Sequence, residues 1–183
     1  MIRVFAYGSN LCIERLRART PSARVVLVGA LGGHSLRWHK KSRDGSGKCD
    51  AFATDAGSDV VWGAVYELTR ADKIALDRFE RLGEDYFEKA VSVRSRDGVV
   101  VDAMAYTANP LLLDARQVPY RWYKRFVTTG AAQHALPPAY RRALESVTDK
   151  EDPDPARHAR EDGGRKRGQT PFGENLYLSR NFR

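Results

Sequence analysis

A chain of 183 residues, 42% hydrophobic and 30% charged, is long enough to bury a core and is expected to form one globular domain. No apolar run approaches a membrane span, and Met1 leads into strand-like residues instead of a charged and then apolar leader. Cys12 and Cys49 lie far apart and lack a metal-binding spacing, which argues against a disulfide framework or a zinc site. We therefore expect a cytoplasmic protein with free thiols.

The net charge of +8 raises the question of nucleic-acid binding. Residues 149–183 carry eight Lys/Arg and seven Asp/Glu, a net of +1, so +7 belongs to residues 1–148. Two local clusters, at residues 15–19 and 121–125, are typical of solvated helix faces. Because the chain contains no recognised nucleic-acid-binding module, we do not expect a nucleic-acid partner. A basic field also attracts a small anionic substrate.

The predicted elements, in chain order, are mostly strands. Strand patterns occupy residues 2–7, 23–30, 35–39, 51–54, 60–68, 87–94 and 99–107. Helical patterns occupy residues 11–18, 71–82, 120–132 and 138–147. Because several strands follow each other directly, the pattern predicts a mainly antiparallel α+β domain, with closure into a barrel as one way to arrange it.

Turn signals and composition predict where the elements and the domain end. Residues 42–48 form a polar, glycine-containing loop, and Asp97-Gly98 between two β-branched runs is a strong hairpin signal. The predicted domain covers residues 1–148. Residues 149–183 are expected to form a charged, flexible tail, in which the apolar residues of 172–182 could dock on the domain or on a partner.

The segment from Val4 to Leu11 is a strand that ends in a small polar turn. Gly8 allows close approach to the backbone, while Ser9 and Asn10 add local hydrogen bonding before a helix begins. Exposed backbone N–H groups at such a turn suit a carboxylate or an oxyanion. The alternative is an ordinary strand-turn-helix with an asparagine cap.

A carboxylate in the predicted helix 71–82 is a candidate general acid and base. Leu76, Phe79 and Gly83 are spaced to form a buried stripe, which Glu80 borders. A carboxylate held against apolar side chains loses hydration, which suits it to accept and return a proton near neutral pH. The alternative is a surface glutamate paired with a neighbouring arginine.

Other chemistries receive less support from the sequence. Ser9 lacks the flanking glycines of a nucleophile elbow, and no motif links it to a histidine base. Cys12 at a helix start could be a nucleophile or a buried, inert thiol. No phosphate loop or dinucleotide fingerprint is present, so no cofactor is implied.

Several short motifs lie in one order along residues 2–147. They are Phe5-Ala6-Tyr7-Gly8-Ser9-Asn10-Leu11, Glu14-Arg15-Leu16, Thr20-Pro21-Ser22-Ala23, Val61-Trp62-Gly63-Ala64-Val65-Tyr66, Leu76-Asp77 with Glu80, Tyr86, Tyr106, Tyr123-Lys124, Gly130-Ala131 and Leu136-Pro137 with Tyr140. Together these motifs resemble the γ-glutamylcyclotransferase family. The resemblance implies a compact β-barrel with flanking helices. It also implies an amide carbon–nitrogen lyase that releases 5-oxoproline from γ-glutamyl amides.

The resemblance assigns roles to residues of this sequence. It implies that Glu80 is the acid/base carboxylate, and that the substrate-binding residues are Val4, Phe5, Ala6, Tyr7, Gly8, Ser9, Asn10 and Tyr123. In such a substrate the α-amine attacks its own γ-carbonyl, so the reaction needs neither an enzyme nucleophile nor a metal. The partner would be a small γ-glutamyl compound.

One departure from the family pattern bears on substrate range. Family members commonly have glycine directly after the catalytic glutamate, whereas Arg81 follows Glu80 here. γ-Glutamyl amino acids, dipeptides and γ-glutamylamines all stay open as substrates. The glutathione-specific branch fits less well, since its usual turn is Tyr-Gly-Ser-Leu and residue 10 is asparagine. A non-catalytic small-molecule or nucleic-acid-binding protein on the same fold is the rival interpretation.

Overall fold

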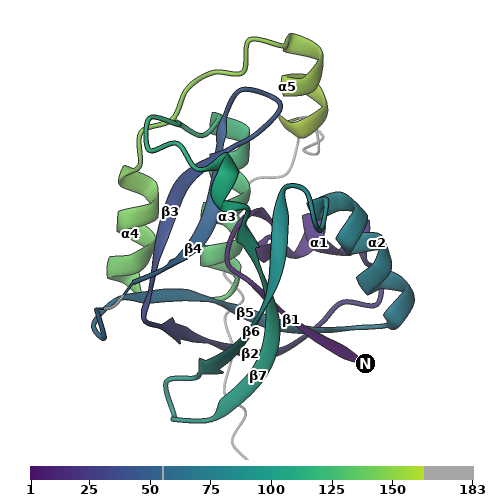
Figure 1. Ribbon diagram of the computed structural model, residues 1–183, viewed down its shortest axis with the longest axis vertical. Helices are drawn as coiled ribbons and strands as arrows, with labels where there is room; N and C mark the ends of the chain where they lie inside the picture. Colours follow the sequence, from purple (N-terminus) through teal and green to yellow (C-terminus); the bar gives the residue numbers. More distant parts are fainter. Residues whose placement is uncertain (55, 163–183) are drawn as a thin grey trace, which may run out of the picture.

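The computed structural model describes residues 1–54 and 56–162 (Figure 1). The strands are β1 (Ile2–Ala6), β2 (Arg24–Gly32), β3 (His34–Lys41), β4 (Gly47–Ala53), β5 (Val60–Leu68), β6 (Tyr86–Arg94) and β7 (Val100–Ala108). The helices are η1 (Ser9–Leu11), α1 (Ile13–Arg19), α2 (Arg70–Glu80), η2 (Pro110–Leu112), α3 (Arg121–Gln133), α4 (Pro138–Ser146) and α5 (Pro155–Asp162). Among these described helices, none has the length and apolar character needed to cross a membrane.

Five strands close into a barrel in the order β1-β5-β2-β6-β7. Neighbouring strands are antiparallel except for β1 and β7, which run parallel and complete the closure. Strands β6 and β7 pair along their whole length on either side of the predicted Asp97-Gly98 turn, where Gly98 has a φ of 89°. The predicted α+β fold with a mainly antiparallel barrel is confirmed.

Strands β3 and β4 form a separate hairpin that rises beside the barrel and next to α3 and α4 (Figure 1). Strand β4 begins at Gly47, before the predicted start at Ala51. The polar sequence misled the prediction because Lys48 is largely buried, with its ammonium group 4.5 Å from the ring centroids of Trp122 and Tyr123. The hairpin thereby carries Cys49 toward the end of β1.

Helix α2 starts as predicted but presents a different face. The Thr69 side chain accepts a hydrogen bond from the backbone N–H of Asp72 and so caps the helix. The helix ends at Glu80, since Arg81 adopts the left-handed conformation with a φ of 53°. The predicted buried stripe was therefore wrong beyond Leu76: Phe79 is 56% exposed, and Gly83 lies past the end of the helix.

Helix α3 packs directly against the turn that follows β1. A Cβ atom placed on Gly130 would lie 2.4 Å from the carbonyl carbon of Leu11, so only glycine allows this approach. Leu11, Val127 and Ala131 are fully buried around the contact. The helix thus fixes the position of the turn.

The segment after residue 148 differs from the flexible tail expected there, as far as residue 162. The carboxylate of Asp152 accepts hydrogen bonds from the indole Nε1 of Trp122 at 2.8 Å and from Nε of Arg157 at 2.6 Å. Asp154 then caps α5 by accepting from the backbone N–H groups of Ala156 and Arg157. These polar contacts hold the segment on the domain without apolar burial. The rest of the predicted tail, with the apolar stretch 172–182, lies outside the described residues.

Candidate active site

The end of β1, the η1 turn, the end of α2 and the tyrosines around them enclose one pocket. It contains about 340 Å³ of empty space, its open mouth included. The lining residues are Phe5, Ala6, Tyr7, Gly8, Ser9, Asn10, Cys49, Glu80, Tyr86, Tyr106 and Tyr123. Eight of the nine residues singled out from the sequence therefore meet in one cavity. The exception is Val4, which is 4% exposed and lies in the barrel wall between β5 and β7.

The turn at Gly8, Ser9 and Asn10 forms one wall of the pocket. It makes a single helical turn, in which the N–H of Leu11 donates to the carbonyl of Gly8 at 3.0 Å. Among the described residues, no hydrogen bond is donated by the backbone N–H groups of Ser9 or Asn10. The first N–H groups of a helical turn lack partners within it, so these two donors can serve a bound anion.

Gly8 lets the turn meet the opposite wall of the pocket closely. A Cβ atom at this position would lie 3.1 Å from Cβ of Cys49 and 3.3 Å from the hydroxyl oxygen of Tyr123. The same hydroxyl accepts a hydrogen bond of 3.0 Å from the backbone N–H of Cys49. A larger residue at position 8 would push the turn away from this wall.

Glu80 is held by two side chains from the other side of the pocket. Its Oε1 atom accepts hydrogen bonds from Nδ2 of Asn10 at 2.9 Å and from the guanidinium of Arg19 at 3.1 Å. Arg19 also donates to Oδ1 of Asn10 at 2.8 Å, which closes a cycle of three side chains. The Glu80 side chain is 15% exposed, so the ion pair is shielded from bulk water. Both contacts to Glu80 use Oε1.

Arg19 also makes a cation–π contact with Phe79, whose ring centroid lies 5.0 Å from the guanidinium carbon. Burial lowers the pKa of Arg19, and the nearby charge of Glu80 works in the opposite direction. An arginine nevertheless stays protonated near neutral pH. It therefore supplies a permanent positive charge beside Glu80.

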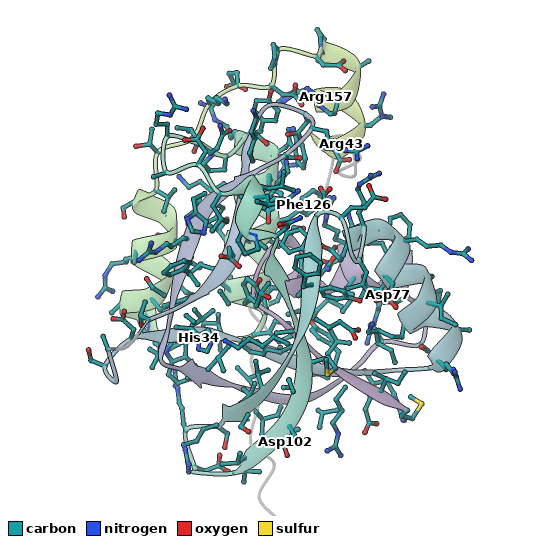
Figure 2. All side chains as sticks on the ribbon, in the orientation of Figure 1. His34, Arg43, Asp77, Asp102, Phe126 and Arg157 are labelled. Atoms are coloured by element: carbon teal, nitrogen blue, oxygen red, sulfur yellow. The ribbon has the colours of Figure 1, made fainter. Side chains whose placement is uncertain are left out.

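Four tyrosines surround the cavity and stay protonated. Burial raises the pKa of Tyr7, Tyr86, Tyr106 and Tyr123 above the ordinary tyrosine value. Tyr7 donates to the carbonyl of Tyr106, and Tyr86 donates to the carbonyl of Cys49 at 3.1 Å. Tyr106 donates to Asp77 at 2.6 Å; Asp77 is labelled beside α2 in Figure 2. The wall is a rigid, neutral surface.

The cysteines and histidines of the described residues offer little nucleophilic chemistry. Burial raises the pKa of the Cys49 thiol to about 12, and it also raises the pKa of Cys12. His39 and His134 contact Asp50 and Tyr66 rather than Ser9. Within residues 1–54 and 56–162, no group of three or more His, Cys, Asp or Glu side chains is arranged to hold a metal ion.

The sequence does not identify Arg19 and Cys49 as neighbours of the site. The arginines at residues 15–19 predict a solvated basic face, but the Arg19 side chain is only 17% exposed. The position of Cys49 in the sequence predicts only a free thiol. Tyr86 and Tyr106 are indicated by the family resemblance alone. Since the residue types around these positions carry no pocket signal, only the fold brings them together.

Comparison with known proteins agrees with this architecture. A family model described as the AIG2-like family matches residues 60–144. The γ-glutamylcyclotransferase of Bos taurus is 30% identical over 156 residues, which cover 78% of this chain and 77% of the bovine protein. This chain belongs to the γ-glutamylcyclotransferase family. The γ-glutamylcyclotransferase of Mus musculus is 29% identical over 160 residues, covering 80% and 79% of the two chains. A solved γ-glutamyl cyclotransferase structure superposes with a TM-score of 0.77 at 24% identity, over 89% and 99% of the chains, and shares the fold.

The residue directly after Glu80 is arginine, where the γ-glutamylcyclotransferase family commonly has glycine. The glycine common in the family at this point suits a left-handed helix end, and Arg81 adopts that same conformation. Its guanidinium pairs with Asp85 at 3.2 Å and with Glu84. The loop after the helix therefore keeps a shape that glycine would allow, and the substitution leaves Glu80 at the C-terminal end of α2.

Proposed function

We propose that this protein is a γ-glutamylcyclotransferase that releases 5-oxoproline and a free amino acid or amine from γ-glutamyl amides. The observation that supports the proposal most is that the carboxylate of Glu80 and the η1 turn line the same pocket. The family relatives named γ-glutamylcyclotransferase support the reaction class.

Glu80 acts as the general acid and base. With Oε1 engaged by Asn10 and Arg19, Oε2 is the atom that exchanges protons with the substrate. It takes a proton from the α-ammonium, and the freed amine attacks the γ-carbonyl carbon to form the new ring C–N bond. The old amide C–N bond then breaks. In total two protons leave the α-nitrogen and two reach the departing amine, with Glu80 carrying them in turn.

The turn binds the glutamyl unit while the protons move. The N–H groups of Ser9 and Asn10 donate to the substrate α-carboxylate or to the oxyanion that forms at the γ-carbonyl. The tyrosine wall folds the glutamyl chain so that its amine and carbonyl meet, which lowers the entropic cost of ring closure. Ser9 is a positioning residue in this scheme.

Incubation with γ-glutamyl-alanine, followed by an assay for 5-oxoproline, tests the function. Glu80→Gln keeps the shape of the side chain and should lower kcat by about 10² to 10⁴-fold while ligand binding persists. Glu84→Gln is the matched control, because Glu84 is 62% exposed and lies outside the pocket lining. Absence of product from a panel of γ-glutamyl amides would overturn the proposal in favour of a binding protein. Near-normal turnover by Glu80→Gln would overturn the assigned role.

A further inference from the structure

A second basic side chain lies one helical turn from Arg19 on the same face of α1. Arg15 is 13% exposed, and its guanidinium carbon lies 4.2 Å from the ring centroid of Phe126 and 5.9 Å from that of Trp122. Its Nε atom is buried without a hydrogen-bond partner among the described residues. Arg15 is thus a rigid, partly desolvated cation with an unused donor.

Arg15 is not one of the pocket-lining residues, but two of its neighbours connect it to the pocket. Trp122, which it covers, precedes the pocket-lining Tyr123 on α3, and the two rings pack edge to face with centroids 6.0 Å apart. Arg19, one helical turn away on α1, donates a hydrogen bond of 3.1 Å to the pocket-lining Glu80. In Figure 2, Phe126 lies between α5 and the barrel.

A carboxylate of this chain already occupies the exposed side of Arg15. Glu161, near the end of α5, accepts a hydrogen bond of 2.7 Å from the Arg15 guanidinium, and its side chain is 29% exposed. The helix that carries it is held at its other end by Asp152, through Trp122 and Arg157. The contact therefore brings a partly exposed carboxylate on a short helix to a cation near the proposed active site.

We propose that Arg15 is a carboxylate subsite that receives the α-carboxylate of the departing amino acid, and that Glu161 fills this subsite in the free protein. The inference rests on the proposed function and narrows its substrate class to γ-glutamyl amino acids or peptides. γ-Glutamylamines lack the carboxylate that Arg15 would bind. The exposed end of the Arg15 guanidinium has one carboxylate partner among the described residues, Glu161, and is suited to such an exchange.

The subsite is tested with γ-glutamyl-alanine and γ-glutamyl-alaninamide. These two substrates differ only in the carboxylate of the departing alanine, which is an amide in the second. Arg15→Gln should lower kcat/KM for γ-glutamyl-alanine by about tenfold to a hundredfold, since a charge-assisted contact is lost. The kcat/KM for the alaninamide should change less than twofold. Arg15→Lys should restore part of the loss. The matched control is Arg17→Gln, which removes the same charge from an exposed position of α1.

Glu161→Gln is an independent test that leaves Arg15 in place. It removes the carboxylate that competes with the substrate for Arg15, so KM for γ-glutamyl-alanine should fall at least twofold. KM for the alaninamide should stay unchanged. An equal loss on both substrates in Arg15→Gln would overturn the subsite, and so would an unchanged KM in Glu161→Gln.

Calorimetric binding to the Glu80→Gln protein separates failure of the subsite from failure of the proposed function. A preference for γ-glutamyl-alanine over the alaninamide that disappears with Arg15→Gln would support the subsite even if the wild-type protein produced no 5-oxoproline. Equal binding of the two compounds would overturn the subsite even in an active cyclotransferase.

Discussion

The side-chain amide of Asn10 donates a 2.9 Å hydrogen bond to Oε1 of Glu80, although 70 positions separate the two residues in the sequence. Arg19 bonds to both, at 2.8 Å to Asn10 and 3.1 Å to Glu80. A polar cycle of this kind holds each side chain in one rotamer. The η1 turn and the end of α2 therefore keep a constant relative position, and the proposed proton carrier stays aligned with the proposed anion donors.

Asn10→Leu removes the donor to Glu80 while keeping the side chain at a similar size. We expect kcat for 5-oxoproline formation to fall by about tenfold to a hundredfold, because a hydrogen bond to a charged group is lost. Asn109→Leu, at a position outside the pocket lining, should leave kcat close to the wild-type value. Wild-type kcat in Asn10→Leu would show that the contact does not position Glu80.

Gly130→Ala should displace the η1 turn. The new Cβ would lie 2.4 Å from the carbonyl carbon of Leu11, a backbone atom that cannot move without its neighbours. We expect a loss of about 1–3 kcal/mol in the free energy of unfolding, measured by urea denaturation, together with lower activity in the folded protein. Gly32→Ala is the control, because a Cβ there meets nothing within 4 Å. Equal stability of the two variants would contradict the close packing.

Arg81→Gly should be neutral or stabilising by up to about 1 kcal/mol. Arg81 holds a left-handed conformation that costs a non-glycine residue roughly 1–2 kcal/mol, whereas its half-exposed ion pairs contribute about 0–1 kcal/mol. Arg78→Gly, within the last turn of α2, should instead destabilise by about 1 kcal/mol. Urea unfolding of both variants measures the contrast. A clear loss of stability in Arg81→Gly would mean that its contacts outweigh the strain.

Docking of α5 should weaken in acid. Pairing with Arg157 holds the pKa of Asp152 below its usual range, so the folded state favours the carboxylate form. The contribution is fully present above the ordinary aspartate pKa of about 3.9 and is lost as the pH falls below it. Hydrogen exchange across residues 155–162, corrected for intrinsic rates, should therefore rise as the pH falls below about 4.

Asp152→Asn is the control for the acid dependence. It cannot titrate, so α5 should exchange faster already at pH 7 and show little further change in acid. The same pH dependence in Asp152→Asn and in the wild-type protein would rule out Asp152 as the cause.

The sequence predicts most strands of the barrel because they carry their signals locally, whereas closure into a barrel is implied only by the family resemblance. Alternating β-branched residues and the Asp97-Gly98 turn predict β6 and β7 without knowledge of their partners. The sequence does not predict the start of β4 or helix α5, because the contacts that hold them are not local. Their polar side chains are typical of solvated segments, but Lys48 and Asp152 pack against Trp122.

The candidate site was predictable to the extent that it is contiguous. The run from Phe5 to Asn10 forms one wall, and Glu80 at the end of α2 adds the carboxylate. The cation beside that carboxylate was not predictable, because helix α1 shows an arginine every second residue and only the fold selects Arg19. The left-handed conformation of Arg81 was equally hidden, since nothing in its residue type announces it.

The parallel pairing of β1 with β7 also bears on how the molecule is made. Strand β1 pairs with residues 60–68 and 100–108. During synthesis it therefore has no strand partner until those segments have left the ribosome. Contacts of such sequence separation form late and slow the search for the native state. Because β7, Tyr106 and Tyr123 follow Glu80 in the chain, a nascent chain that already contains the η1 turn and Glu80 would still lack the assembled pocket. Ligand binding at this pocket is therefore a direct assay of complete folding.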